Sequence, residues 1–233
     1  MRIWYQSLVD GGRVPAYFDG MAERARAIGR PGTDVRFVSM PEGTYGARTP
    51  ADSVIYPYIA SLHEQTILDH ALQAEAEGYD VFAIGSVQDP ALEVARSLVD
   101  IPVVGYGEAA MHFATLLGGK FAVVVFGERF DQMMDQRIER LGFRERAIPT
   151  IRMDATFADV SRGDAALIER FRETALEAIA RGAEALIPGQ LYLSEGIARA
   201  GLTRIEEVPI VDGLATTLKM AESMAELKHL GIS

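Results

Sequence analysis

Residues 78–112, GYDVFAIGSVQDPALEVARSLVDIPVVGYGEAAMH, decide the fold class, because short apolar strands alternate with helical segments in this stretch. Val81 to Ile84 is an apolar run that ends at a glycine, and a second run follows at Val103-Val104. Strands that alternate with helices build a parallel sheet, and ligands bind at the carboxyl ends of its strands. The loops after the two runs, residues 85–89 and 105–108, are therefore the expected place of a site.

Two helices are predicted inside this stretch. Asp89-Pro90 has the pattern of a helix N-cap followed by proline at the first helical position. The apolar side of that first helix is expected to comprise Ala91, Leu92, Val94, Ala95 and Leu98. The second helix is predicted to begin at Glu108, after the turn Gly105-Tyr106-Gly107.

The same alternation continues on both sides of the stretch. Further strands are predicted at residues 2–8, 35–40, 120–126, 185–187 and 208–211. Further helices are predicted at 15–28, 56–77, 128–141, 164–181, 193–200 and from Asp212-Gly213 to residue 230. Residues 144–153 are expected to be an extended connection. The connection over 41–54 is longer than a plain link needs, and loops of such length are usually functional or disordered.

Bulk composition narrows the class of protein. The chain has 233 residues, 48% of them hydrophobic, and can bury the core of one large or two small domains. A net charge of −10 and a pI near 4.9 argue against nucleic acid and anionic membrane surfaces as partners. The N-terminal segment is not expected to be a secretory signal, and no apolar run is long enough to span a membrane. A cytoplasmic location is therefore expected.

The chain contains no cysteine. Disulfides, thiolate nucleophiles and thiolate metal sites are therefore excluded. His63 and His70 lie seven residues apart on one side of a predicted helix, with no third ligand nearby in the sequence. We interpret them as ordinary helix residues and predict no metal.

Two blocks of the sequence match two later blocks in the same order. Residues 78–86, GYDVFAIGS, match residues 182–190, GAEALIPGQ, in their leading glycine, their acid, their apolar strand and their final glycine. Residues 100–104, DIPVV, match residues 207–211, EVPIV. Both longer blocks follow a predicted helix. Matched blocks in the same order predict two similar α/β halves, with chance similarity between α/β units as the alternative.

If the repeat is real, Ser86 and Gln190 are equivalent positions on opposite walls of one cleft. The fold class predicted is α/β, with two pseudo-symmetric Rossmann-like domains, parallel sheets and the cleft between them. The first domain is expected to comprise residues 1–108 plus 211–233, and the second residues 109–210.

The central stretch resembles the Asp/Glu/hydantoin racemase superfamily. The resemblance is carried by Asp89-Pro90-Ala91-Leu92, by residues 99–105, VDIPVVG, and by residues 107–110, GEAA. The block 182–190 looks like the second catalytic strand of that family. The resemblance covers most of the chain and is strongest over residues 78–126.

The resemblance implies two pseudo-symmetric α/β domains with a small-molecule site between them. Members of the superfamily include amino-acid and hydantoin racemases, maleate isomerases and arylmalonate decarboxylases. In the racemases two facing cysteines act as an acid–base pair at a carbon next to a carbonyl, and no metal or organic cofactor is needed. The resemblance also implies that the protein forms a homo-oligomer.

This chain departs from the family pattern at both chemical positions. The first cysteine aligns with Ser86 and the second with Gln190. Glutamine cannot titrate, and a serine hydroxyl is a poor base unless another group activates it. Thiol-based racemisation and the one-cysteine mechanisms are therefore excluded. Backbone N–H groups in the loops can still polarise a carbonyl or bind a carboxylate.

The function predicted is that of a superfamily enzyme acting on a small carboxylate, hydantoin-like or cyclic-amide substrate. Its chemistry would be of the isomerase, hydrolase or decarboxylase type and would need no cofactor. The alternative is a non-catalytic protein that binds small carboxylates on the same scaffold.

Four residues are candidates for catalysis. Ser86 is a nucleophile or a donor to substrate, or else a loop serine bonded to its own backbone. Gln190 is a group that holds a carbonyl or orients a water, or else an ordinary polar loop residue. Glu108 and His112 lie four apart on one helix and could form a base pair. Alternatively, Glu108 only favours the helix dipole and His112 is a half-buried polar contact.

Further residues at strand ends and in the long loop are candidates for substrate contacts. They are Gln6, Ser7, Tyr45, Arg48, Val87, Gln88, Leu191 and Tyr192. The resemblance implies a contribution from the end of the first strand, at Gln6 and Ser7. Arg48 could clamp a carboxylate, although an exposed loop arginine is the alternative. Tyr192 could line the pocket or simply pack at a strand end.

A rival motif overlaps the second loop. Gly105 to Ala110 fits G-x-G-x-x-A between a strand and a helix, and Glu128 follows about twenty residues on, as in a dinucleotide-binding site. The motif sits at the fourth strand, whereas this fingerprint normally opens the first βαβ unit. Glu108 would place a negative charge where a pyrophosphate lies. A dinucleotide-dependent enzyme is therefore the least favoured alternative.

Overall fold

The computed structural model describes residues 1–11, 15–46, 48–162 and 165–232. The chain divides into two compact units, which are defined by their residues. The first unit is Met1–Tyr106 with Leu214–Ser233, and the second unit is Gly107–Gly213. The domain limits drawn from the sequence stay a prediction.

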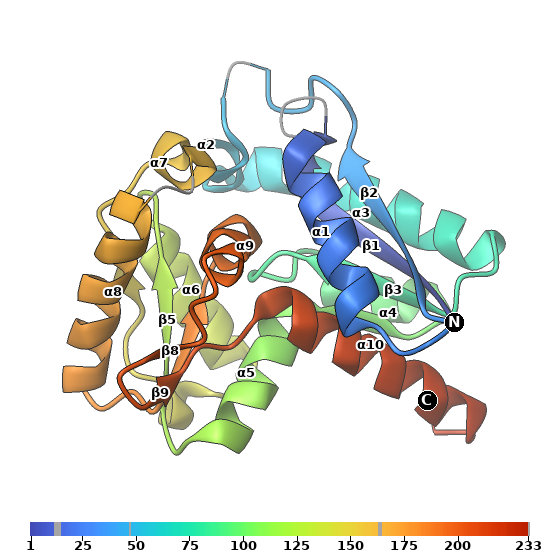
Figure 1. Cartoon of the computed structure of the whole chain (residues 1–233). Helices are drawn as coiled ribbons and strands as arrows, with labels where there is room; N and C mark the ends of the chain where they lie inside the picture. The colour runs from blue at the N-terminus through green and yellow to red at the C-terminus, as the bar shows by residue number, and fades with distance from the viewer. Residues whose placement is uncertain (12–14, 47, 163–164, 233) are drawn as a thin grey trace. The chain divides into compact units, whose positions relative to one another are not determined.

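The first unit is built on a parallel sheet in the order β2-β1-β3-β4 (Figure 1). Its strands are β1 (Arg2–Asp10), β2 (Asp34–Met40), β3 (Val81–Gly85) and β4 (Val103–Gly105). Its helices are α1 (Pro15–Ile28), α2 (Pro50–Val54), α3 (Pro57–Ala76), α4 (Leu92–Leu98) and α10 (Gly213–His229). Ile3 pairs with Val81 and Ser7 with Gly85, so β3 ends beside Ser7 while β1 continues to Asp10.

The core of the first unit packs the sheet against α3 and α4. Trp4 is 1% exposed, and its ring meets the edge of the Tyr79 ring at 5.3 Å between centroids. Ile67 of α3 and Leu92 of α4 belong to the same buried cluster. Burial of such large apolar side chains is the main stabilising contribution to the unit, at about 1.5–3 kcal/mol for each.

A buried carboxylate connects α10, drawn in red in Figure 1, to the turn after α1. The Glu222 side chain is fully buried and accepts hydrogen bonds from the Arg30 N–H at 2.7 Å and the Thr33 hydroxyl at 2.8 Å. Lys219 Nζ lies 2.9 Å from its other oxygen. Burial alone would raise the pKa of Glu222, but the hydrogen bonds from Arg30, Lys219 and Thr33 lower it overall.

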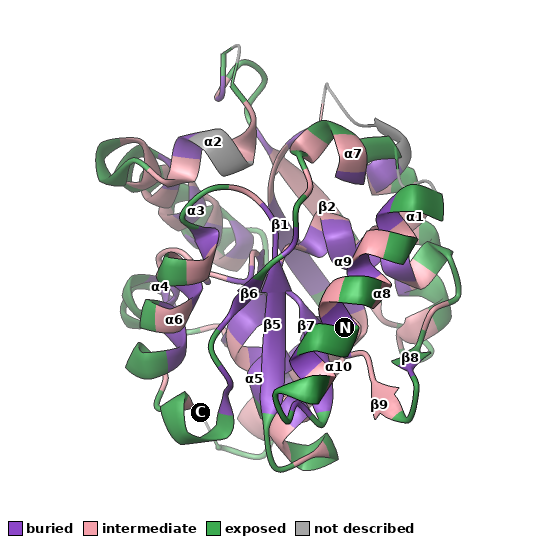
Figure 2. Cartoon of the chain, turned by 90° about the vertical axis from the view of Figure 1, so that its left-hand side faces the viewer, coloured by how far each residue is buried: buried purple, intermediate pink, exposed green. Residues whose placement is uncertain are grey.

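The second unit is also built on a parallel sheet, in the order β6-β5-β7. The strands of this sheet are β5 (Phe121–Val125), β6 (Ile151–Arg152) and β7 (Ala185–Pro188). A separate two-stranded sheet is formed by β8 (Arg204–Ile205) and β9 (Val208–Pro209). The helices of the unit are α5 (Tyr106–Leu117), α6 (Phe130–Arg140), α7 (Phe157–Arg162), α8 (Ala165–Ala180), α9 (Leu191–Arg199) and a 3-10 turn at Arg144–Arg146. Figure 2 shows β5 buried along its length, as expected for a central strand with both faces covered.

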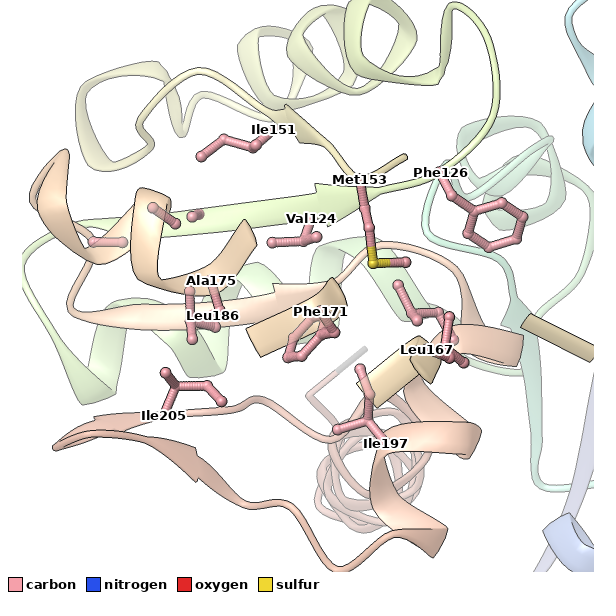
Figure 3. Close-up of a cluster of buried hydrophobic side chains, with 14 of the residues drawn as sticks. Val124, Phe126, Ile151, Met153, Leu167, Phe171, Ala175, Leu186, Ile197 and Ile205 are labelled. Atoms are coloured by element: carbon pink, nitrogen blue, oxygen red, sulfur yellow. The ribbon is translucent and has the colours of Figure 1, made fainter. Parts of the chain in front are cut away.

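The core of the second unit lies between this sheet and the helices α8 and α9. Val124, Leu186, Phe171 and Ile197 come from β5, β7, α8 and α9, and their side chains gather in one cluster (Figure 3). Leu167 and Phe171 of α8 are fully buried in this cluster, whereas Leu176 of the same helix is 39% exposed.

The sequence repeat is also a structural repeat. Phe82 is paired with Val103 in the first unit, and the equivalent Leu186 forms a parallel bridge with Ile210 in the second. The order β2-β1-β3-β4 therefore has the counterpart β6-β5-β7 followed by the segment at Ile210. The leading glycines Gly78 and Gly182 both adopt positive φ, at 73° and 97°, where they end α3 and α8.

The predicted start of α4 at Asp89-Pro90 is wrong. The helix begins at Leu92, because Asp89 and Ala91 adopt left-handed φ values of 47° and 60°. These two residues fold the segment into a tight turn before any helix can form. The predicted apolar side is only partly buried, since Val94 is 53% and Leu98 42% exposed.

Several other boundaries differ from the prediction. Helix α5 begins at Tyr106 instead of Glu108, and α2 forms within the predicted loop. The short β6 and α7 were not predicted, because segments of two and six residues have little periodicity. The last predicted strand, 208–211, contributes mainly to an antiparallel hairpin with β8. The predicted start of α8 at Asp164 lies outside the described residues.

Candidate active site

The turn that joins β3 to α4 is tightly built. Its backbone is closed by a hydrogen bond of 2.9 Å from the Asp89 N–H to the Ser86 carbonyl. A Cβ added at Gly85 would overlap the Tyr5 ring and lie 3.1 Å from the Gln6 carbonyl oxygen. Asp89 is 1% exposed. A side chain at Gly105 would overlap the Asp89 carboxyl group, so both glycines are required by close packing.

This turn carries polar groups that the structure leaves unpaired. Within the described residues, no group hydrogen-bonds the Ser86 hydroxyl, which is half-buried. The Nε2 atom of Gln88 is buried and has no partner there either. The backbone N–H groups of Val87 and Gln88 likewise donate to no described residue. The turn can therefore offer several hydrogen-bond donors to an oxygen atom of a ligand.

Gln6 and Ser7 lie on β1 beside the end of β3, and their predicted contact with a substrate stays a prediction. Gln6 is fully buried, and its Oε1 atom lies 2.6 Å from His70 Nδ1 and 3.3 Å from Trp4 Nε1. Its Nε2 atom donates to the Ser7 carbonyl at 3.0 Å. Ser7 is 1% exposed, and its hydroxyl oxygen accepts from the Val9 N–H at 3.2 Å. Both side chains support the strand end from inside the unit, and neither offers a polar group at the surface.

The long loop before α3 brings Tyr45 to the same strand end. The Tyr45 hydroxyl donates to the Leu8 carbonyl, and the Tyr45 ring meets the His63 ring edge-on at 4.8 Å. Burial, with a smaller contribution from the Asp10 carboxylate, raises the pKa of Tyr45 well above its usual value. The phenol therefore stays protonated and holds the loop against the strand.

The other residues of this region are placed as follows. The Arg48 guanidinium lies over the Tyr56 ring, 5.1 Å from its centroid. His63 is 4% exposed, its Nδ1 has no partner among the described residues, and burial lowers its pKa. Burial also lowers the pKa of His70. The same residues contain no group of three His, Asp or Glu side chains arranged to hold a metal ion.

The turn that joins β7 to α9 uses its polar side chain within the unit. Gln190 Oε1 accepts from the Phe126 N–H at 3.2 Å, and Gln190 Nε2 donates to the Phe126 carbonyl at 2.8 Å. The amide thus closes the end of β5 as a neighbouring strand would. A Cβ at Gly189 would overlap Val125 Cγ1 and lie 3.0 Å from Val123 Cγ1, so this turn also requires its glycine.

The two residues after Gln190 belong mainly to the packing of the second unit. Leu191 is 4% exposed at the start of α9. The Tyr192 ring lies 5.3 Å from the Phe157 ring, and burial raises the pKa of its phenol. The structure therefore agrees with the packing alternative for Tyr192, and its predicted substrate contact stays a prediction.

Glu108 and His112 do not form the pair that their spacing predicted. Both lie on α5, but no hydrogen bond or ion pair joins them in the described part of the chain. His112 is exposed, and its ring meets the Phe143 ring edge-on at 5.0 Å. Glu108 lies in the first turn of the helix, where a carboxylate favours the dipole.

The local geometry argues against the dinucleotide-binding alternative. Because α5 begins at Tyr106, Gly107 lies inside the helix and not in a phosphate-binding loop. Gly105 packs directly against the carboxyl group of Asp89, so a pyrophosphate has no approach to its backbone there.

Asp89 and Glu195 are buried acids that were not recognised from the sequence. Asp89 was interpreted as a helix cap, and Glu195 was not considered, although it is 2% exposed on α9. Acidic residues on a helix are usually exposed, so nothing in the local pattern of α9 marks Glu195 as buried. No helix in the described ranges is both long and apolar enough to cross a membrane.

Comparisons with known proteins all point to one family. The sequence model of the Asp/Glu/Hydantoin racemase family matches residues 15–221. The chain is 28% identical to a hydantoin racemase of Pseudomonas sp. (strain NS671) over 209 residues, which cover 89% of this chain and 80% of that protein.

Solved structures extend the likeness over the whole chain. The allantoin racemase of Klebsiella pneumoniae superposes with a TM-score of 0.82 at 27% identity, covering 100% of this chain and 89% of that one. An allantoin racemase from Pseudomonas fluorescens superposes with a TM-score of 0.79 at 22% identity, covering 100% and 93%, and shows the same fold. With the family model matched over most of its length, the chain belongs to the Asp/Glu/hydantoin racemase family of enzymes.

Proposed function

We propose that this protein is an enzyme that acts on a hydantoin-like or other cyclic-amide ring, at the carbon next to a ring carbonyl, without thiols. The observation that carries the proposal is the β3–α4 turn, whose donors at Ser86, Val87 and Gln88 have no partner among the described residues. The names of its relatives support the substrate class, since hydantoin and allantoin share a five-membered ring with two amide-type carbonyls.

The chemistry follows from what such donors do. When the proton leaves the carbon next to a carbonyl, the electron pair of the broken C–H bond moves onto the carbonyl oxygen. Hydrogen bonds to that oxygen stabilise the resulting enolate, and each donor contributes roughly 10²–10³-fold in rate. Because neither Ser86 nor Gln190 is a thiol, a solvent water accepts the proton. Delivery of a proton from water to the opposite face of the same carbon then gives the inverted ring.

A non-catalytic binding protein on the same scaffold is the second candidate. One observation favours it: both polar atoms of the Gln190 amide are bonded to Phe126, so the second turn has no free acid or base at this position. A protein of this kind would bind the ring or a small carboxylate and leave its C–H bonds intact.

The deciding experiment follows substrates in D₂O by NMR. Hydantoins with a substituent at carbon 5, allantoin, α-amino acids, maleate and arylmalonates are incubated with the protein. We expect deuterium uptake at the ring carbon of a hydantoin, and its rate should fall roughly 10²-fold or more in Ser86→Ala. Ser97→Ala is the matched control, because the Ser97 hydroxyl is exposed on α4 and bonds only the Val94 carbonyl.

The outcomes separate the candidates. Line broadening of a ligand without deuterium uptake in any compound would support the binding protein. Turnover of an arylmalonate or of maleate alone would replace the proposed reaction with decarboxylation or double-bond isomerisation. Equal uptake in the wild type and Ser86→Ala would remove the β3–α4 turn from the reaction.

A further inference from the structure

Gln88 carries a buried donor that nothing in its own unit uses. Its Nε2 atom is buried and has no hydrogen-bond partner in the part of the chain that the structure describes. A buried donor left unsatisfied costs about 1–3 kcal/mol, so native proteins rarely keep one without a use. No described residue bonds the Oε1 atom of the same amide either.

The backbone around Gln88 forms a tight, closely packed turn. The turn is closed between Ser86 and Asp89, and it contains left-handed φ values of 47° at Asp89 and 60° at Ala91. Such values are unfavourable for residues with a Cβ, and they are typical of sites where geometry matters. Val87, directly before Gln88, is 2% exposed and anchors the turn in the core. The amide is therefore attached to a packed, hydrogen-bonded turn, two residues from Ser86.

We infer that Gln88 is the residue that selects the ring, by pairing with an adjacent N–H and C=O of a cyclic amide. The inference rests on the proposed function and names the substrate group that this site recognises. The Nε2 donor would bind the ring carbonyl next to the acidic carbon, and Oε1 would accept from the ring N–H beside that carbonyl.

A primary amide suits this edge for a simple chemical reason. It presents one donor and one acceptor side by side, which matches the acceptor and donor of a ring amide. A carboxylate offers acceptors only and would leave Oε1 facing an oxygen atom. The same pairing also directs Nε2 at the carbonyl that must be polarised, so that recognition and activation use one side chain.

The test compares two hydantoins that differ at this edge. Binding of 5-methylhydantoin and of its N3-methyl derivative, which lacks the ring N–H, is measured by isothermal titration calorimetry. We expect the wild type to prefer the unmethylated ring by roughly tenfold or more, because a site built to hydrogen-bond a group rejects the analogue that lacks it. In Gln88→Leu this preference should fall below about twofold.

Variants at Gln88 and elsewhere make the result specific. Gln88→Glu keeps the acceptor and loses the donor, so it should bind 5-methylhydantoin more weakly than the wild type. Gln65→Leu is the control, because Gln65 is exposed on α3 and its replacement should leave the preference unchanged. If Gln88→Leu does not fold, the Gln88→Glu comparison still decides.

The inference and the proposed function fail in different ways. A preference that is unchanged in Gln88→Leu, or no binding of either ring, would overturn the inference. A preference that depends on Gln88, combined with no deuterium uptake from D₂O, would uphold the inference and defeat the proposed reaction. Deuterium uptake with a preference that does not depend on Gln88 would uphold the proposed reaction and overturn the inference about Gln88.

Discussion

The β3–α4 turn of the first unit and the β7–α9 turn of the second occupy equivalent places but treat their polar side chains in opposite ways. In the first turn the Ser86 hydroxyl and the Gln88 Nε2 atom have no partner among the described residues. In the second, the Gln190 amide makes two hydrogen bonds to Phe126. Equivalent positions in a repeat therefore need not have equivalent functions.

The two turns also differ in backbone conformation. The first turn has left-handed residues at Asp89 and Ala91 before its helix begins. In the second, Gln190 is extended, with a φ of −118°, and α9 begins at the next residue. Strain that persists in a folded protein marks positions where geometry serves function. The comparison therefore supports the proposal that the first turn recognises substrate, whereas Gln190 in the second turn closes the end of β5.

The largest loss of stability is expected at the closely packed glycine that both turns contain. Gly85→Ala and Gly189→Ala should each destabilise the protein by about 3 kcal/mol, because the added Cβ overlaps Tyr5 or Val125 and a packed core yields little. Urea unfolding measures the loss. Gly196→Ala on α9 is the control, since the nearest side-chain atom to its Cβ is 3.7 Å away. Equal stability of Gly189→Ala and Gly196→Ala would contradict the close packing of the second turn.

The next largest loss of stability should distinguish the second turn from the first. Gln190→Leu should cost about 2 kcal/mol, because it leaves the N–H and C=O of Phe126 unsatisfied, whereas Ser86→Ala should cost less than about 0.5 kcal/mol. The same urea experiment compares the two variants. The assignment of structural closure to Gln190 would be wrong if both replacements proved equally harmless to stability.

Acid should affect the first unit through Glu222. Because its folded pKa is lowered from 4.5, Glu222 contributes stability above that value, and the contribution is lost as the pH falls through the folded pKa. Glu222→Gln should therefore destabilise the protein by about 1 kcal/mol near neutral pH, and by less at about pH 3. Urea unfolding at both pH values measures this, and amide hydrogen exchange assigns the loss to one unit.

A matched control for Glu222 lies one turn further along α10. Glu226 also pairs with Arg30, but its side chain is 51% exposed. Exposed pairs contribute little, so Glu226→Gln should change stability by less than about 0.5 kcal/mol at either pH. A larger acid response from Glu226 than from Glu222 would show that the buried carboxylate is not the group that titrates.

The smallest effect is expected at the predicted pair on α5. His112→Ala should lower stability by about 0.5 kcal/mol, through the lost ring contact with Phe143, and should not change deuterium exchange of a hydantoin. His112→Phe keeps an aromatic ring and should restore stability. A loss of exchange in both variants would return His112 to the catalytic residues and extend the site beyond the β3–α4 turn.

The prediction from sequence was most successful for the fold, and the predicted roles of the site residues stay predictions. Helix α1 has the predicted ends, and the strands around Val81 and Val103 lie where the apolar runs indicated. The start of α4 was wrong, because the left-handed turn at Asp89 and Ala91 has the same residues as an N-cap followed by proline. Single-residue backbone states of this kind leave no periodic signal.

The sequence did not reveal hydrogen bonds between site candidates and residues that are distant in the chain. Gln6 was expected at a substrate but is bonded to His70, and Gln190 was expected at the reacting carbon but is bonded to Phe126. Each of these partners is 64 residues away in the sequence. Neither partnership leaves a pattern in the residues that surround it.

The sequence by itself determined the α/β class, the repeat, the absence of thiols and the equivalence of Ser86 and Gln190. These follow from local periodicity, from glycine positions and from residue identity, which chain neighbours largely decide. Only the tertiary structure decided which polar groups remain available to a ligand. That depends on hydrogen bonds between strands and helices distant in the chain, as at Phe126 and Gln190, and such bonds exist only once the units are packed.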